Sequence, residues 1–299
     1  MKRLALILLV PSLFLALLTS CASTTPPGPR AITDDLGRAV NIEAVPQRII
    51  SLAPNITEIL FALDLGDKVV GVTDACDYPR EALAKPKVGA YFATSLETII
   101  NQDPDIVLSD GHDSVYEQLE SLGVTVVVIQ STNIDGILRD IELVGQITDK
   151  EEEAEELVVE MERRIDDIVA KTTGVEKPTV FYVVDASDPT KPWTAGEGSF
   201  IDALISLAGG ENIAASEDQY TQFSLEALVS ADPEIIIGPT SHGTSFLPDL
   251  GSLSGWKEMS TMKGGEVYLI EADLISRSGP RIVGGLEEMA RIIHPELFP

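Results

Sequence analysis

Short apolar runs alternate with amphipathic segments along most of the chain. Val, Ile and Leu dominate the runs 49–52, 69–72, 106–108 and 124–129, which is typical of strands that are buried on both faces. Between these runs, apolar residues recur at helical spacing, as in the helix expected to start near Asn55. The alternation predicts an α/β fold in which helices cover both faces of parallel sheets.

One piece of this pattern occurs twice. The stretch SLETIINQDPDIVL at 95–108 returns as SLEALVSADPEIII at 224–237, and each copy predicts a helix, an Asp-Pro stop and a buried strand. The second half adds the strand patterns PTVFYVVD and EVYLIE. We therefore predict two Rossmann-like lobes of similar design, at 31–148 and 173–299, with a ligand cleft between them.

The segment 149–172 predicts a single continuous helix between the lobes. Its apolar residues form one stripe at helical spacing, and its first turns are acidic, which suits the helix dipole. The stripe consists of Ala154, Leu157, Val158, Met161, Ile165 and Ile168. Such a helix would join the lobes as a stiff rod.

Two capping boxes are expected where helices begin. Asn55 should cap the first helix while Glu58 reaches back to the backbone, and Thr148 with Glu151 should start the interlobe helix in the same way.

The first residues have the layout of an export signal. A basic start, an apolar run and small residues precede Cys21, so 1–20 is expected to be a cleaved leader and 21–30 a flexible tether. A permanent membrane helix is the rival interpretation, but the run is short and contains Pro11. LTSC resembles the bacterial lipobox, which implies a lipid on Cys21. The protein is thus expected outside the cytoplasm, anchored at the outer face of the cell membrane or in the periplasm.

The net charge limits the possible partners. The 299-residue chain has a formal net charge of −27. Without Lys2 and Arg3 of the leader, 19 basic residues face 48 acidic ones, a net charge of −29. This charge disfavours nucleic acid and anionic lipid headgroups, so membrane contact should depend on the lipid anchor. Cys76 is the one cysteine left, so the fold must be stabilised by its core.

The ligand-binding residues are expected where the strands end, because ligands of open α/β sheets bind beyond the carboxyl ends of the strands. His112 and His242 follow equivalent strands and could face each other across the cleft, although polar loop residues are the simpler interpretation. They are weak metal candidates, because the spacing supplies no third ligand nearby. Trp193 is expected in a loop at the cleft, where an exposed aromatic ring suits a large flat ligand.

Catalytic motifs are missing from the sequence. GEGS at 196–199 lacks the third glycine of a dinucleotide fingerprint, and no phosphate-binding loop or nucleophile elbow is found. An enzyme is therefore disfavoured.

Several longer stretches resemble a known family. RIISLAPNITEILFALDLGDKVVGVTDACDYP, KVGAYFATSLETIINQDPDIVL, PWTAGEGSFIDALISLAGGENI and SRSGPR are similar to the substrate-binding proteins of vitamin B12 and iron-siderophore importers, the class with a rigid interlobe helix. CDYP before KVGAY, and PWTAGEGS before GGENI, favour the cobalamin branch. The resemblance covers nearly the whole chain after the tether.

This resemblance implies roles for individual residues. Tyr91, Trp193 and Tyr220 would flank a corrin ring, and Asp273 and Arg277 would contact its polar side groups. A structural ion pair between Asp273 and Arg277 is the alternative. The family often has Trp at the first and third of these aromatic positions and an aromatic residue where Ala75 stands, which leaves the particular corrinoid open.

Glu97 and Glu226 resemble two glutamates that dock onto arginines of the membrane permease, one from each lobe. The alternative is that each simply suits the helix dipole, because each follows a Ser cap. Arg281 is expected to start the last helix.

The expected function is that of a monomeric, lipid-anchored substrate-binding protein that captures cobalamin or a related corrinoid and delivers it to an ABC permease and ATPase. The corrinoid is cargo, and no catalytic cofactor or nucleic acid is expected. The rigid helix predicts a small closure on binding. A ferric-siderophore or haem receptor is the alternative, although Arg277 and Arg281 give little basic charge for an anionic siderophore. An adhesion or sensing module is a third possibility.

Overall fold

The N-terminal lobe is built on a four-stranded parallel sheet. A computed structural model describes residues 28–240 and 247–298. The strands lie in the order β4-β3-β7-β8, namely β4 (Val69–Val72), β3 (Ile49–Ser51), β7 (Ile106–Ser109) and β8 (Val126–Val128). Helices of this lobe are α1 (Pro54–Ala62), α2 (Leu96–Asn101), α3 (Val115–Ser121) and α4 (Ile134–Thr148). Two antiparallel pairs complete it, β1 (Arg30–Thr33) with β2 (Ala39–Ile42) and β5 (Gly89–Ala90) with β6 (Ala93–Thr94).

The C-terminal lobe repeats this plan. Its parallel sheet has the order β11-β9-β13-β14, namely β11 (Glu211–Asn212), β9 (Thr179–Tyr182), β13 (Ile235–Thr240) and β14 (Val267–Glu271). A separate antiparallel pair joins β10 (Trp193–Ala195) to β12 (Tyr220–Gln222). The helices are α6 (Phe200–Leu207), α7 (Leu225–Ala231), α8 (Leu247–Leu250), α9 (Ser260–Gly264), α10 (Ala272–Ser276) and α11 (Ile282–Ile293). Short 3-10 turns occupy Gly66–Lys68, Arg80–Ala84 and Trp256–Glu258.

The two sheets share one topology, in which the second strand of the lobe lies outside the first and the third and fourth follow on the other side. The repeated sequence forms the helix before the third strand and that strand itself, α2 with β7 and α7 with β13. Ser95 and Ser224 cap these helices by accepting a backbone N–H. Asp103 and Asp232 both take left-handed backbone angles, with φ of 47° and 42°, directly before Pro. The repeat is therefore preserved down to its caps and helix stops.

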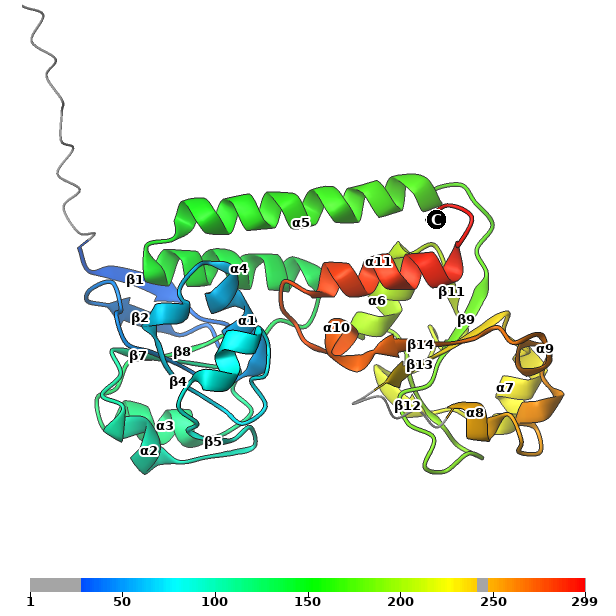
Figure 1. The fold of residues 1–299 in the computed structure, drawn as a ribbon, viewed down its shortest axis with the longest axis horizontal. Coiled ribbons are helices and arrows are strands. Elements are labelled where there is room, and N and C mark those ends of the chain that lie inside the picture. Colours follow the sequence, from blue (N-terminus) through cyan, green and yellow to red (C-terminus); the bar gives the residue numbers. More distant parts are fainter. Residues whose placement is uncertain (1–27, 241–246, 299) are drawn as a thin grey trace, which may run out of the picture.

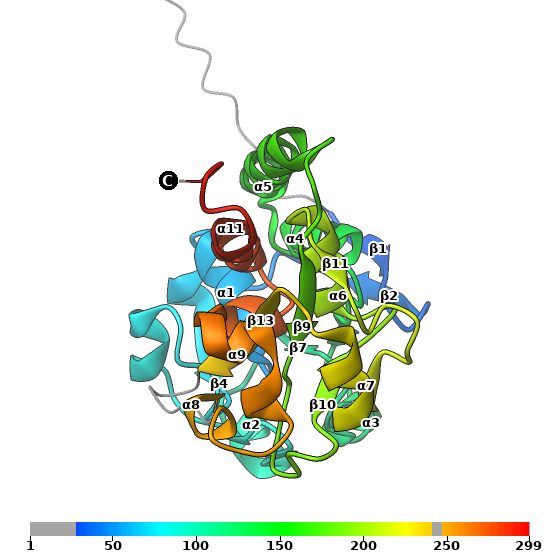
Figure 2. The same ribbon diagram turned by 90° about the vertical axis from the view of Figure 1, so that its right-hand side faces the viewer.

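The lobes are joined by α5 (Glu151–Thr172), which runs along both of them (Figure 1). Seen along its axis, α5 lies above α4 and α11, the helices that cover the two lobes on this side (Figure 2). The predicted apolar stripe faces inward: Ala154, Val158, Met161 and Ile168 are buried, and Leu157 and Ile165 are half-buried. The two Rossmann-like lobes joined by one long helix therefore confirm the predicted fold class.

The predicted cap at Thr148 is wrong. This residue is the last of a separate helix, α4, and its hydroxyl donates to the carbonyl of Val144. Asp149 then reverses the chain in a left-handed conformation, and α5 begins at Glu151 without a side-chain cap. The reason is tertiary, because α4 and α5 pack against each other and need a tight turn between them.

The predicted leader at 1–20, the lipidation residue Cys21 and His242 lie outside the residues that the structure describes. Within 28–240 and 247–298, no helix combines the length and the apolar character needed to cross a membrane.

Candidate functional site

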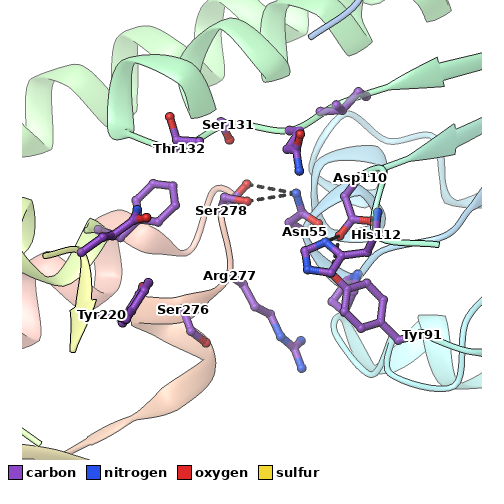
Figure 3. A pocket seen from close by; sticks show the side chains of 15 residues that line it. Asn55, Tyr91, Asp110, His112, Ser131, Thr132, Tyr220, Ser276, Arg277 and Ser278 are labelled. Atoms are coloured by element: carbon purple, nitrogen blue, oxygen red, sulfur yellow. Dashed lines mark hydrogen bonds and ion pairs between the residues drawn. The ribbon is translucent and has the colours of Figure 1, made fainter. Parts of the chain in front are cut away.

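A cleft of about 440 Å³ lies between the lobes at the carboxyl ends of the N-terminal strands. The N-terminal lobe contributes residues that directly follow three of its strands: Asn55 after β3, Asp110 and His112 after β7, and the segment 129–132 after β8. The C-terminal lobe faces them with Phe200, Gln219, Tyr220 and the segment 276–278. Figure 3 shows the two sets on opposite sides of the open space.

Aromatic side chains form the N-terminal wall. Tyr91 lies in the turn between β5 and β6, and its hydroxyl donates to the carboxylate of the nearly buried Asp110. Burial and this hydrogen bond raise the pKa of Tyr91 above its usual value, so the phenol stays protonated. The rings of Phe92 and His112 lie 4.5 and 5.4 Å from the ring of Tyr91, between centroids.

The opposite wall carries Tyr220, on the short β10–β12 sheet. Trp193 starts β10 and is paired in register with Gln222, so Trp193 and Tyr220 share one face of that sheet as diagonal neighbours. Trp193 is 41% exposed and Tyr220 is 49% exposed, which is a high exposure for large aromatic side chains. The expectation that Trp193 lies in a loop is wrong, because β12 pairs with this stretch. Tyr220 lines the cleft, whereas Trp193 lies beyond its described lining.

Arg277 occupies the floor of the cleft and is surrounded by carboxylates. Its guanidinium contacts Asp273 at 2.8 Å in its own lobe, and Glu58 at 3.2 Å and Asp77 at 2.7 Å in the other lobe. Burial opposes the ionisation of Asp77, but the hydrogen bond and charge of Arg277 outweigh it and lower the pKa of Asp77. Asp273 is not among the residues that line the cleft. The ion-pair interpretation of Arg277 and Asp273 thus agrees with their geometry.

Glu58 also forms a bidentate ion pair with Arg281 of the C-terminal lobe, with N–O distances of 2.7 and 3.0 Å. Arg281 precedes α11 as its cap residue and lies 4.0 Å from the ring centre of Tyr78. We call Glu58, Asp77, Asp273, Arg277 and Arg281 the interlobe cluster. It separates the cleft from a hollow of about 630 Å³ on the helix side of the molecule.

The predicted capping box of Asn55 and Glu58 is therefore wrong. Pro54 occupies the first turn of α1, and no side chain caps that helix. The side chain of Asn55 instead donates across the cleft floor to Ser278, at 3.2 Å to its hydroxyl, and Glu58 is used by two arginines. The spacing in the sequence matches a capping box, but long-range partners with full charges form stronger interactions.

Glu97 and Glu226 lie at matching positions in the first turns of α2 and α7, and both are exposed. Neither has a hydrogen bond or ion pair from its side chain among the described residues. Their carboxylates are therefore available to a partner on each lobe.

His112 lies 3.3 Å from Asp110, between Nδ1 and Oδ2. No group of three or more possible metal ligands occurs in residues 28–240 and 247–298, so this pair does not form a complete protein metal site there. Among the described residues, the candidate metal site therefore consists of His112 and the adjacent carboxylate of Asp110.

Sequence reasoning missed several cleft residues. Phe200 begins α6 and lines the cleft. Phe92, which is 73% exposed, directly follows the lining residue Tyr91 but is not itself among the described lining residues. Ser131 and Thr132 form a polar rim after β8 (Figure 3). Phe92 could have been noticed because it adjoins Tyr91 in the sequence, whereas Phe200 resembles any apolar residue at a helix start.

Comparisons with known proteins agree with this geometry. A family described as periplasmic binding protein matches residues 49–274. An uncharacterised ABC transporter substrate-binding lipoprotein of Bacillus subtilis, YvrC, is 33% identical over 280 residues, which cover 90% of this chain and 87% of the relative. A vitamin B12-binding protein of Vibrio parahaemolyticus is 30% identical over 248 residues, 81% of this chain and 88% of the relative.

A crystal structure of a possible iron-binding, periplasmic solute-binding protein from Staphylococcus epidermidis superposes with a TM-score of 0.74 at 28% identity, and covers 84% of this chain and 99% of that chain. The matched region includes both lobes and the interlobe helix. These relatives are binding proteins, in agreement with the missing catalytic motifs. The chain belongs to the periplasmic binding protein family, as an ABC transporter substrate-binding protein.

Proposed function

We propose that the protein captures cobalamin or a related corrinoid outside the cytoplasm and delivers it to an ABC permease. The observation that carries this proposal is the presence of aromatic rings on both walls, Tyr91 on one side and Phe200 and Tyr220 on the other. Phe92 and Trp193 are the aromatic neighbours of Tyr91 and Tyr220 outside the described lining. A corrin ring has two broad faces and a rim of amides. Aromatic walls and a polar rim suit such a ligand.

The charge of the cleft supports the same ligand. Arg277 is the one cation among the described lining residues, and three carboxylates surround it. The carboxylate of Asp110 adds negative charge at the opposite wall. An anionic ferric siderophore would therefore meet little uncompensated positive charge, whereas a neutral or cationic corrinoid would meet no such penalty.

Haem or another iron complex is the second candidate, because a solved relative described as possibly iron-binding shares the fold at 28% identity.

The deciding experiment is a titration of the purified protein with cyanocobalamin, haemin and a ferric hydroxamate. Binding is followed by calorimetry and visible absorption. We expect saturable 1:1 binding of cyanocobalamin and much weaker binding of the ferric hydroxamate. Preference for an iron complex would reject the corrinoid proposal.

The proposed delivery uses Glu97 and Glu226 as docking contacts with the permease, one from each lobe. Their equivalent positions, in the repeated helix starts, and their exposure support this role. Export with a lipid on Cys21 would keep the protein beside that permease, and one relative is itself a lipoprotein. Mass spectrometry of the membrane fraction, with Cys21→Ser as the control, tests the anchor.

A further inference from the structure

The hollow on the helix side of the interlobe cluster has the size of a small-molecule site. Its volume is about 630 Å³, and ligand pockets in proteins typically measure roughly 300–1,000 Å³. Three parts of the protein enclose it. The N-terminal lobe contributes the end of α1 and the turn around Pro79, α5 contributes one of its faces, and the C-terminal lobe contributes Leu274 and the start of α11. A ligand bound here would therefore contact both lobes and the interlobe helix at once.

Apolar side chains from all three parts face this hollow. Phe61, Leu157 and Leu274 pack against the main core but are only half-buried, and Met161 of α5 is fully buried behind them. A Cβ added at Gly284 of α11 would meet no atom within 4 Å, so the neighbouring side chains leave this space open. An apolar ligand would remove the exposed parts of these side chains from water, which stabilises a complex.

The charge of the lining favours a cation. Both lining guanidiniums, those of Arg164 and Arg281, are already paired with carboxylates, at 2.8 and 2.7 Å. The carboxylates of Asp64 and Glu81 are exposed, and neither side chain has a hydrogen bond or ion pair among the described residues. The uncompensated charge of the lining is therefore negative, as is the net charge of −27 of the whole chain. Such a field attracts cations and disfavours anions.

An aromatic ring in the lining also favours a cation. Tyr78 is 46% exposed, although the guanidinium of Arg281 lies 4.0 Å from its ring centre. The faces of aromatic rings attract organic cations, quaternary ammonium groups among them. The hollow thus combines an apolar interior, an accessible aromatic ring and two unpaired carboxylates.

We infer that this hollow is a second binding site, for a small organic cation with an apolar body. The apolar part of the ligand would pack against the apolar lining, and its charged end would face Asp64 or Glu81. Glu58 and Arg281 of the interlobe cluster form part of the wall, so the ligand adds contacts between the lobes beside that cluster. The inference goes beyond the proposed function and does not depend on the identity of the cargo.

The test uses octyltrimethylammonium as the probe and octanesulfonate, with the same chain and the opposite charge, as its control. NMR spectra of the protein labelled with ¹³C at the methionine methyl groups locate the binding. Met161 lines the hollow, whereas Met259 and Met262 belong to a separate core cluster of the C-terminal lobe. The cation should shift the Met161 resonance saturably, with a Kd on the order of 1 mM for a ligand of this size, and leave the other two unchanged. Octanesulfonate should bind at least about 10-fold more weakly.

Two sets of variants test the position and the charge of the site. Gly284→Leu should fill the hollow and abolish the response of Met161 to the cation. Its control is Gly264→Leu on α9, where an added Cβ would make one ordinary contact at 3.7 Å, and this variant should respond like the wild type. Replacement of the exposed Asp64 by Asn together with Glu81 by Gln should reduce the preference for the cation over the sulfonate from about 10-fold to about 2-fold.

The outcomes are decisive in either direction. A saturable response at Met161 that Gly284→Leu abolishes and the charge-neutralised variant makes unselective supports the site. The inference is rejected if Met161 does not respond, if octanesulfonate binds as tightly as the cation, or if Gly284→Leu still responds. Parallel shifts of Met259 and Met262 would indicate a general surfactant effect and reject it as well. Each of these rejections leaves the corrinoid proposal untouched, because the cargo cleft takes no part in the test.

Discussion

Glu58 lies almost fully buried at the contact between the lobes, where it is shared by Arg277 and Arg281. The substitution Glu58→Gln removes its charge with little change in shape. Arg277 keeps Asp77 and Asp273 as partners, but Arg281 loses the one carboxylate with which it pairs in the described part of the chain. The substitution therefore leaves a partly buried guanidinium without a counter-charge.

The size of the effect follows from this arrangement. Removing one partner of a buried ion pair costs about 3–5 kcal/mol, and a glutamine oxygen still accepts one hydrogen bond, so we expect about 3 kcal/mol. With an unfolding entropy of about 0.6 kcal/mol/K for a chain of this length, the Tm should fall by about 5 °C.

Thermal unfolding followed by circular dichroism, with urea titration at 25 °C, measures this loss. The matched control is Glu160→Gln on α5, where the same chemical change affects a fully exposed ion pair with Arg163 at 2.8 Å. The control should unfold like the wild type, because solvent screens such pairs. A Tm for Glu58→Gln equal to that of the control would refute the argument that the interlobe cluster stabilises the native protein.

Four other predictions concern binding, transport, pH and shape. Trp193→Ala should weaken corrinoid binding about 10-fold, about 1.4 kcal/mol, in calorimetry; unchanged affinity would remove this ring from the site. Charge reversal of both Glu97 and Glu226 to Arg should leave binding intact but block uptake by cells, and normal uptake would exclude docking. Burial and the neighbouring charge of Asp35 raise the pKa of Asp140 to about 7. The native state therefore binds a proton at Asp140 that the unfolded chain has released, so the contribution of Asp140 to the free energy of unfolding should fall as the pH rises from about 4 to 7. Asp140→Asn should flatten that slope in urea titrations, and an unaltered slope would assign it to other groups. X-ray scattering profiles with and without ligand should nearly coincide, whereas marked compaction on binding would contradict the rigid connection.

Much of the fold could be predicted because it is encoded locally. Buried strands such as β8 consist of continuous Val residues, and the apolar stripe of α5 is visible in the sequence. The repeated Ser and Asp-Pro signals predicted equivalent helices, and Asp103 and Asp232 end them with the same left-handed conformation. Local signals of this kind need no knowledge of distant residues.

The candidate site was harder to predict, because its contacts join residues far apart in the sequence. Asn55 and Glu58 have the spacing of a capping box, but their partners are 219 to 223 positions away. The strand pair that carries Trp193 and Tyr220 is interrupted by a helix, so no hairpin signal marks it. The family resemblance supplied the aromatic residues Tyr91, Trp193 and Tyr220, whereas the contact between Asp110 and His112 became visible only in three dimensions.

The interlobe cluster has a consequence for unloading. Because Glu58 and Asp77 of one lobe form ion pairs with arginines of the other, the two lobes are connected by charged contacts. Two lobes that are already connected lose little conformational entropy when a ligand binds between them. Opening of the lobes for release of the cargo is therefore not favoured by itself. The free energy needed to separate the lobes must then come from the transporter that receives the cargo. These ion pairs are among the contacts that the separation has to break.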